Sequence, residues 1–120
     1  MTSLDDPSGS RAHQDGLMVI TLPSEIDVSN GGQLKDAVAR GLGNGTRVLV
    51  ADAGGTTFCG CAGVRELLAA HHQAATHGVQ FRVVASPAVL RILELSAADE
   101  VLETYPTMGA ALDGQNGAIT

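Results

Sequence analysis

The sequence predicts a single α/β domain built on a mixed sheet. Three apolar runs, at residues 17–22, 48–51 and 80–85, have the length and character of buried strands. Segments with apolar residues at helical spacing separate these runs, and strands that alternate with helices form sheets with right-handed crossovers. The chain of 120 residues, 44% of them hydrophobic, can supply the core of one domain. We expect this domain to span residues 16–113, between a mobile N-terminal tail of residues 1–15 and a loose C-terminal tail of residues 114–120.

The first strand, at residues 17–22, should end at Pro23, because proline has no N–H to donate to a neighbouring strand. A brief extended piece at residues 25–27 precedes a helix that Ser29 or Asn30 can cap. The helix should run to about residue 42, where Gly41, Gly43 and Gly45 can supply the left-handed conformations that end it. Its expected buried stripe consists of Leu34, Ala37, Val38 and Leu42.

The central run at residues 48–51 is broken by two glycines, and a loop at residues 56–60 follows. Cys61 then begins a second helix, which should end where Gly78 occupies the position after its C-cap. Phe58, one of only two phenylalanines, lies between this strand and helix and is therefore expected to anchor the core. The expected buried face of the helix consists of Val64, Leu67, Leu68, His71 and Ala75.

The C-terminal third contains one further strand and helix and two shorter elements. Phe81 and Val83 should share one side of a strand at residues 80–85. Ser86 and Pro87 are a helix start signal, with serine as N-cap and proline at the first helical position. Residues 101–105 can form an edge strand, and Thr107 can cap a last short helix. The apolar side of the helix after Pro87 consists of Val89, Leu90, Ile92 and Leu93.

The composition excludes several classes of function. The net charge of −6 disfavours nucleic acid and anionic membranes as partners, because both require a basic surface. No apolar run approaches the ~18 residues of a membrane span, and the acidic N-terminus lacks a signal-peptide core, so we expect a cytoplasmic protein. Neither a catalytic constellation nor a phosphate-binding loop is visible, so the sequence predicts neither an enzyme nor a cofactor site.

A family resemblance becomes specific at residues 48–63, V-L-V-A-D-A-G-G-T-T-F-C-G-C-A-G. This run resembles the central segment of STAS domains, in which a buried strand leads into F-x-D-S-[ST]-G. Phe58 and Gly63 match that motif. Gly60 stands where the family has Asp, Cys61 where it has the phosphorylated Ser, and Ala62 where it has a second hydroxyl residue.

The resemblance covers residues 17–112. P-S-E-I-D-V-S-N at residues 23–30 is similar to the family's G-x-[IL]-D-x-x-[ST], and residues 86–96 and 105–112 resemble its two later segments. It implies a four- or five-stranded mixed sheet flanked by helices, with the loop at residues 56–63 exposed at one edge. It also implies an edge strand before Leu17, for which only residues 11–14 are available, so this strand should be short or missing.

By this resemblance the chain is a bacterial regulatory module, an anti-sigma factor antagonist. It would bind an anti-sigma factor of the kinase-like ATPase type and release the sigma factor. In the family, phosphorylation of the loop Ser adds about −1.5 to −2 charges at the interface and blocks docking. The implied partner-binding and switch residues are Asp27, Thr56, Thr57, Cys59, Gly60, Cys61, Ala62 and Gly63.

Replacement of the serine by Cys61 means that the usual phosphorylation switch cannot operate. Three consequences are open. The antagonist is constitutively competent, or control passes to thiol chemistry, or the chain serves another partner, such as a lipid-transport permease complex with a STAS subunit.

The two cysteines allow structural and chemical interpretations. Both can be buried space-filling residues, or Cys61 at the helix N-terminus can be a reactive redox thiol, with Cys59 beside it. A zinc site with His71, His72 or His77 lacks the usual paired spacing, so no metal is expected. The run F-C-G-C also resembles a thioredoxin-like site shortened by one residue, which leaves a thiol–disulfide redox protein as an alternative function.

Two aspartates also have competing interpretations. Asp27 resembles the family's acidic residue near the phosphorylation loop, and Asp52 follows the central strand. Either carboxylate can instead simply accept hydrogen bonds from the N–H groups of a turn, as aspartate often does.

Overall fold

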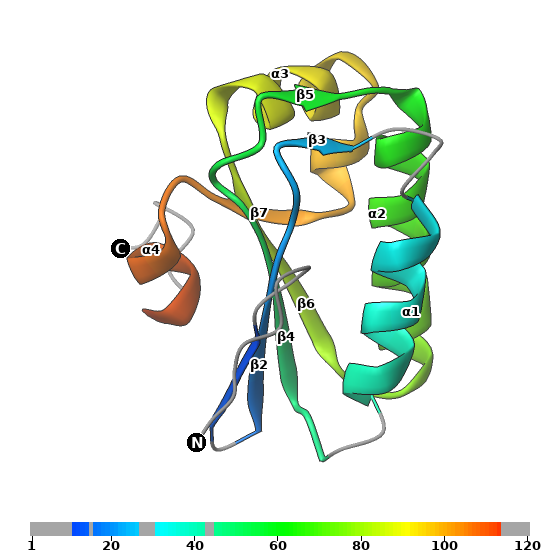
Figure 1. Cartoon of the computed structure of the whole chain (residues 1–120), viewed down its shortest axis with the longest axis vertical. Helices are drawn as coiled ribbons and strands as arrows, with labels where there is room; N and C mark the ends of the chain where they lie inside the picture. The colour runs from blue at the N-terminus through cyan, green and yellow to red at the C-terminus, as the bar shows by residue number, and fades with distance from the viewer. Residues whose placement is uncertain (1–10, 15, 27–30, 43–44, 114–120) are drawn as a thin grey trace.

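The computed structural model describes residues 11–14, 16–26, 31–42 and 45–113. A five-stranded sheet with the order β1-β2-β4-β6-β7 crosses the molecule (Figure 1). The hairpin pair β1–β2 is antiparallel and the other neighbours are parallel, so the predicted four- or five-stranded mixed sheet is confirmed. The strands are β1 (Arg11–Gln14), β2 (Leu17–Thr21), β4 (Val48–Ala53), β6 (Gln80–Ala85) and β7 (Glu103–Tyr105).

The edge strand β1 lies within the first 15 residues, for which the sequence predicts a mobile tail. It pairs with β2 over its whole length, Arg11 opposite Ile20 and Gln14 opposite Leu17, so the strand is short but present. The other residues of the two expected tails, 1–10, 15 and 114–120, lie outside the described residues.

The alternation of side chains along β4 separates two cores. Leu49, Ala51 and Ala53 belong to the main core, together with residues of α1 (Gly31–Leu42), α2 (Cys61–Thr76) and α3 (Pro87–Leu95). Val50 points to the other face, where it packs in a smaller core with Ala111 of α4 (Met108–Asp113). The period-2 pattern of a strand buried on both faces therefore fixes which helices cover which side of the sheet.

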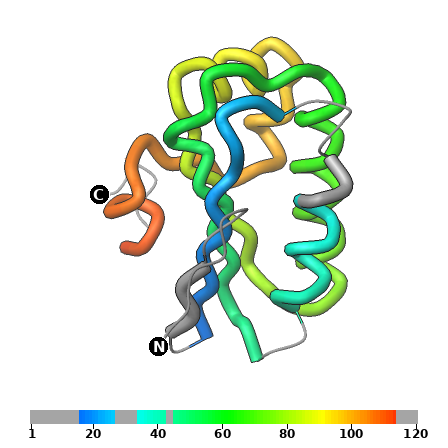
Figure 2. Tube along the Cα trace, in the orientation of Figure 1, coloured from blue at the N-terminus to red at the C-terminus, as the bar shows by residue number. Residues whose placement is uncertain are grey.

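Two further short strands form a small separate sheet. β3 (Glu25–Ile26) pairs in parallel with β5 (Phe58–Cys59). Figures 1 and 2 show this pair at one end of the molecule, next to α3, although the two segments are more than 30 positions apart in the chain. The single-turn helix η2 (Ala98–Glu100) links α3 to β7.

The predicted face of α2 is partly wrong. Val64 and Leu67 are buried as expected, but Ala75 is exposed, and Ala70 and Ala74 take its place in the core. The helix packs against both α1 and β6, so its buried stripe is broad and contains small residues where the neighbours approach closely. Gly78 ends the helix with a φ of +72°, as predicted.

The glycine at the end of α1 also has a different role from the predicted one. Gly41 is buried inside the helix, and a Cβ there would lie 2.5 Å from the sulfur of Met18. Gly41 therefore leaves room for the Met18 side chain of β2 and does not supply a left-handed conformation. Gly45 does have a positive φ of 71°, while the predicted caps Ser29 and Asn30 and the predicted stop Gly43 lie outside the described residues.

Candidate functional site

The segment from Thr57 to Gly60 is fixed by backbone hydrogen bonds to the chain around β3. The N–H groups of Thr57 and Phe58 both donate to the carbonyl of Ser24, at 2.8 and 3.2 Å, and the N–H of Gly60 donates to the carbonyl of Ile26 at 3.0 Å. Because β3 and β5 are parallel and only two residues long, these bonds set the register of the whole segment. The candidate site is thus a short strand leading into a helix, and not an irregular loop.

Thr56 anchors this segment from inside. Its side chain is 1% exposed, and its hydroxyl donates to the carbonyl of Pro23 at 2.7 Å. Its own carbonyl accepts a 2.6 Å hydrogen bond from the hydroxyl of Ser86, the N-cap of α3. Thr56 therefore joins three segments of the chain and is inaccessible to a partner, whereas Thr57 is exposed.

Phe58 is exposed, so the prediction that it anchors the core is wrong. Its side chain is 52% accessible, and the core beneath β5 is filled by Cys59 instead. The reason is the strand geometry of Phe58–Cys59, in which successive side chains point to opposite sides. Once Cys59 faces the core, Phe58 must face the solvent.

The two cysteines differ in environment, so the interpretation in which both are buried space-filling residues does not describe Cys61. Cys59 is buried and Cys61 is exposed. Burial raises the pKa of the Cys59 thiol, and the neighbouring Cys61 raises it further. Of the two sulfurs, only that of Cys61 is open to a reagent or a partner.

Cys61 is the first residue of α2, as predicted. Gly60 is the N-cap, with extended backbone (φ −86°, ψ −178°), and no side chain within the described part of the chain caps the helix. A 16-residue helix directs its partial positive charge at this end, so a negative group at position 61 would be stabilised by the helix itself. Ala62 beside it is half-buried.

Gly63 is the point at which β3, β5 and α2 meet. A Cβ there would lie 2.7 Å from the Cys59 sulfur and 2.9 Å from Cγ2 of Ile26. No side chain fits into this gap without displacing the strand pair. Packing against Cys59 and Ile26 therefore explains the glycine at position 63.

The remaining candidates divide into three groups. Asp27 lies outside the described residues. Asp52 accepts a hydrogen bond from the N–H of Gly54 at 2.9 Å. This is the turn interpretation, one of the two alternatives that the sequence leaves open for Asp52. His71 is half-buried and His77 is exposed, and the described residues contain no group of three or more ligand side chains placed to hold a metal ion.

Sequence reasoning missed the contribution of Ser86 to this site. Its spacing before Pro87 correctly predicts an N-cap, and its hydroxyl accepts from the N–H of Val89 at 3.2 Å. The same hydroxyl donates to Thr56, 30 positions earlier. Local patterns contain no signal for that second bond, because it exists only after β4 and β6 have paired.

The comparison with protein families decides the assignment. The model of the STAS domain family matches residues 10–111 of this chain. The chain belongs to the STAS domain family. The predicted family and fold are therefore confirmed.

Known STAS proteins resemble the chain over nearly all of its length. It is 28% identical over 118 residues to the anti-sigma-F factor antagonist RsfB of Mycobacterium tuberculosis, which covers 98% of this chain and 96% of the relative. A crystal structure of an anti-sigma factor antagonist from Mycobacterium paratuberculosis has a TM-score of 0.80 at 28% identity, with 92% and 97% coverage. The antagonist SpoIIAA in its unphosphorylated form shares the fold, with a TM-score of 0.73 at 15% identity over 94% of this chain and 100% of that one.

One negative finding concerns membranes. Among the described residues of this STAS domain, none of the helices combines the length and the apolar character that crossing a bilayer requires.

Proposed function

We propose that this STAS domain is an anti-sigma factor antagonist whose partner surface consists of Thr57, Phe58, Gly60, Cys61 and Ala62. The relatives with 28% identity carry this function in their names. The partner that the family resemblance implies is an anti-sigma factor of the kinase-like ATPase type. Asp27, which the resemblance also assigns to this surface, is included in the proposal on that ground alone.

The observation that carries the proposal is the exposed Phe58 beside the exposed Cys61. Aromatic side chains are enriched among the residues that dominate binding energy at protein interfaces, whereas a half-exposed phenylalanine contributes little to the fold of a monomer. Phe58 is held by β5 and Cys61 by the start of α2, so both are presented on regular structure. Little conformational entropy would be lost when a partner covers them.

Cys61 has a specific consequence for regulation. The hydroxyl that accepts phosphate in the family is absent, and Thr57 is the exposed threonine in the segment, since Thr56 is buried with its hydroxyl bonded to Pro23. We therefore propose that a serine kinase leaves position 61 unmodified. Incubation with ATP and kinases of the anti-sigma type, followed by mass spectrometry, tests this, and stoichiometric phosphate on Thr57 would show that the switch has moved by four positions.

The partner surface is tested by binding measurements. The parent protein is used as bait in a pull-down from the native cytoplasm, and calorimetry then measures the affinity for the anti-sigma factor that it captures. We expect Phe58→Ala to weaken binding by about 30-fold or more, which corresponds to the ~2 kcal/mol of an interface hot spot. Cys61→Asp should weaken binding at least about tenfold, because it buries an unpaired charge in the interface, whereas Cys61→Ser should be nearly neutral.

Two matched control variants show whether a loss of binding is specific to the proposed partner surface or follows from any lost apolar side chain or added charge. Leu112→Ala removes an exposed apolar side chain from α4, which packs against the opposite face of the sheet from α1, α2 and α3. Ala39→Asp adds a charge at an exposed position in the last part of α1, away from β5 in Figure 1. Both should bind as the parent does. Folded Phe58→Ala and Cys61→Asp variants that also bind as the parent does would refute the proposed surface.

A further inference from the structure

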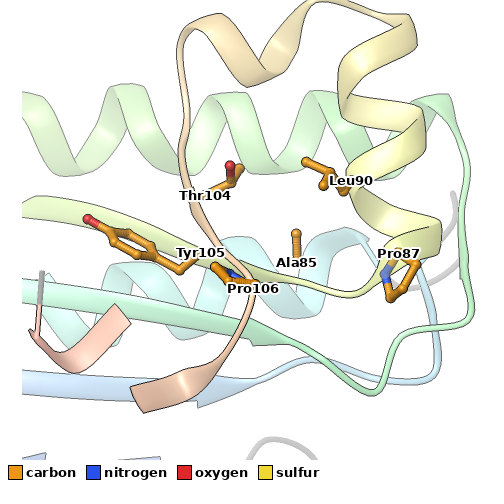
Figure 3. A pocket seen from close by; sticks show the side chains of 6 residues that line it. All are labelled: Ala85, Pro87, Leu90, Thr104, Tyr105 and Pro106. Atoms are coloured by element: carbon orange, nitrogen blue, oxygen red, sulfur yellow. The ribbon is translucent and has the colours of Figure 1, made fainter. Parts of the chain in front are cut away.

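A pocket of about 440 Å³ lies between the first turns of α3 and the strand β7. Figure 3 shows Pro87 and Leu90 on the α3 side, Thr104 and Pro106 on the β7 side, and Ala85 at the end of β6 between them. Tyr105 completes the lining. The volume is within the range of ~300–1,000 Å³ that is typical of small-molecule sites.

The walls of this pocket are held by regular structure. β6 and β7 are paired beneath it, with Val84 opposite Tyr105. The start of α3 is fixed by the Ser86 N-cap, and Pro87 and Pro106 have restricted backbones on the two sides of the opening. The pocket is therefore formed before any ligand arrives, and binding would require little reorganisation.

The lining has few polar groups. None of the described residues that line the pocket carries a charge, and four of the six are alanine, leucine or proline. The Tyr105 side chain packs in the smaller core on the α4 face of the sheet, where its hydroxyl donates to a carboxylate oxygen of Glu103 at 3.0 Å. The Thr104 hydroxyl is thus the side-chain group that remains available to a ligand.

From this chemistry we propose that the pocket binds an uncharged small molecule with an apolar body and one hydrogen-bonding group. A charged ligand would lose its hydration against apolar walls without gaining a counter-charge, which costs several kcal/mol. The apolar body would pack between Leu90 and Pro106, and the polar group would reach Thr104. Phe58 and Cys61 are not part of the lining, so the small molecule and the anti-sigma factor would contact different residues.

The experiment uses octan-1-ol and octanoate, which share their chain and differ in the charge of the head group. Amide resonances of the full-length 15N-labelled protein are followed during titration with each probe. We expect saturable shifts with octan-1-ol, centred on the amides of Ala85, Leu90, Thr104 and their non-proline neighbours, and affinity for octanoate lower by about tenfold or more. Shifts that do not saturate, that centre on other residues, or that are equally strong with octanoate would each overturn the proposal.

Single substitutions test the contributions of Leu90 and Thr104 to ligand binding in this pocket. Leu90→Trp should fill the pocket and abolish the octan-1-ol shifts, while Leu95→Trp, on the same helix at a 73% exposed position outside the lining, should leave them unchanged. Thr104→Val keeps the shape and removes the hydroxyl, so it should weaken octan-1-ol about threefold to tenfold, the equivalent of one hydrogen bond. Because Thr104→Val tests the site without adding bulk, it remains decisive if Leu90→Trp fails to fold. Unchanged octan-1-ol affinity in Thr104→Val would refute the role of the hydroxyl.

Discussion

By the motif resemblance, Gly60 occupies a position at which STAS domains have an aspartate. The family's aspartate would be the N-cap of α2, where a carboxylate can accept the N–H groups of the first turn. The chain has glycine there, with backbone angles that any L-residue adopts. Among the described residues, a Cβ at Gly60 would meet the ring of Phe58, at an ordinary contact distance of 3.6 Å. The packing of the described residues around Gly60 therefore leaves room for an aspartate side chain.

The first prediction concerns the room for a side chain at position 60. Gly60→Asp should stabilise the fold by about 0.3–1 kcal/mol through the new cap and the helix dipole. Urea unfolding at neutral pH measures the change, and Gly60→Asn serves as the control that caps without a charge. A folded Gly60→Asp variant that is less stable than the parent would show that the N-terminus of α2 is already satisfied in another way.

The second prediction concerns Cys59. Burial is the main cause that raises its pKa above the ordinary 9.0, so the folded state holds this proton more tightly than the unfolded chain does. The corresponding stability is complete below the unfolded pKa and is lost as the pH rises through the folded value. The free energy of unfolding should therefore decline above about pH 9, and the decline should be shallower in Cys59→Ala.

Urea titrations at a series of pH values test this, with Cys61→Ala as a comparison that keeps the buried Cys59 thiol and removes the smaller contribution of the exposed Cys61 to its pKa. Tyr105, whose pKa is raised from 10.0 mainly by burial, adds a decline at higher pH that all three proteins share. Equal slopes for Cys59→Ala and the parent between about pH 8 and about pH 10 would contradict the assignment of the decline to Cys59.

At the scale of elements, the sequence predicted what local patterns encode. The starts of α2 at Cys61 and α3 at Pro87 follow from the glycine and serine–proline signals before them, and the runs of β2, β4 and β6 follow from continuous hydrophobicity. β3 and β5 could not be recognised as a separate sheet, because two residues are too few to show a period. Without that pairing, the alternation that exposes Phe58 and buries Cys59 could not be assigned.

The third prediction tests the connection between the candidate site and α3. Ser86→Ala removes the N-cap of α3 and leaves the buried Thr56 carbonyl without its donor. We expect a loss of roughly 1–3 kcal/mol in stability, together with faster amide exchange at residues 57–60.

The natural control is Ser96→Ala at the other end of the same helix. Ser96 is exposed and its hydroxyl donates to the carbonyls of Ile92 and Leu93, so its removal should cost no more than about 0.5 kcal/mol. If Ser86→Ala and Ser96→Ala have equal effects on stability and on exchange at residues 57–60, the bond between Ser86 and Thr56 does not support the site.

At the scale of the whole molecule, Arg82 of β6 connects the strand to α4 and lies beside Glu103 of the edge strand β7. From β6 its side chain donates to the Ala111 carbonyl of α4 at 2.7 Å and to Gln80 at 3.1 Å. Its Nε lies 3.8 Å from the Glu103 carboxylate of β7, close enough for ionic attraction but too far for a hydrogen bond. With its side chain only 13% exposed, this residue holds α4 and β7 against the sheet.

The last prediction is that Arg82→Glu destabilises the protein by roughly 2–4 kcal/mol without changing the partner surface. The substitution removes the donor to Ala111 and places a second carboxylate beside Glu103, in a molecule whose net charge is already −6. Arg91→Glu makes the same change of charge at an exposed position of α3, and surface substitutions of this kind usually change stability by less than about 0.5 kcal/mol. Urea unfolding of both variants separates the loss of these contacts from the change in net charge, and calorimetry at a temperature where both are folded compares their affinities for the anti-sigma factor. Equal stability of the two variants would show that the Arg82 contacts do not hold the molecule together. A selective loss of binding in folded Arg82→Glu would place the interface on the α4 side of the sheet, and not around Phe58.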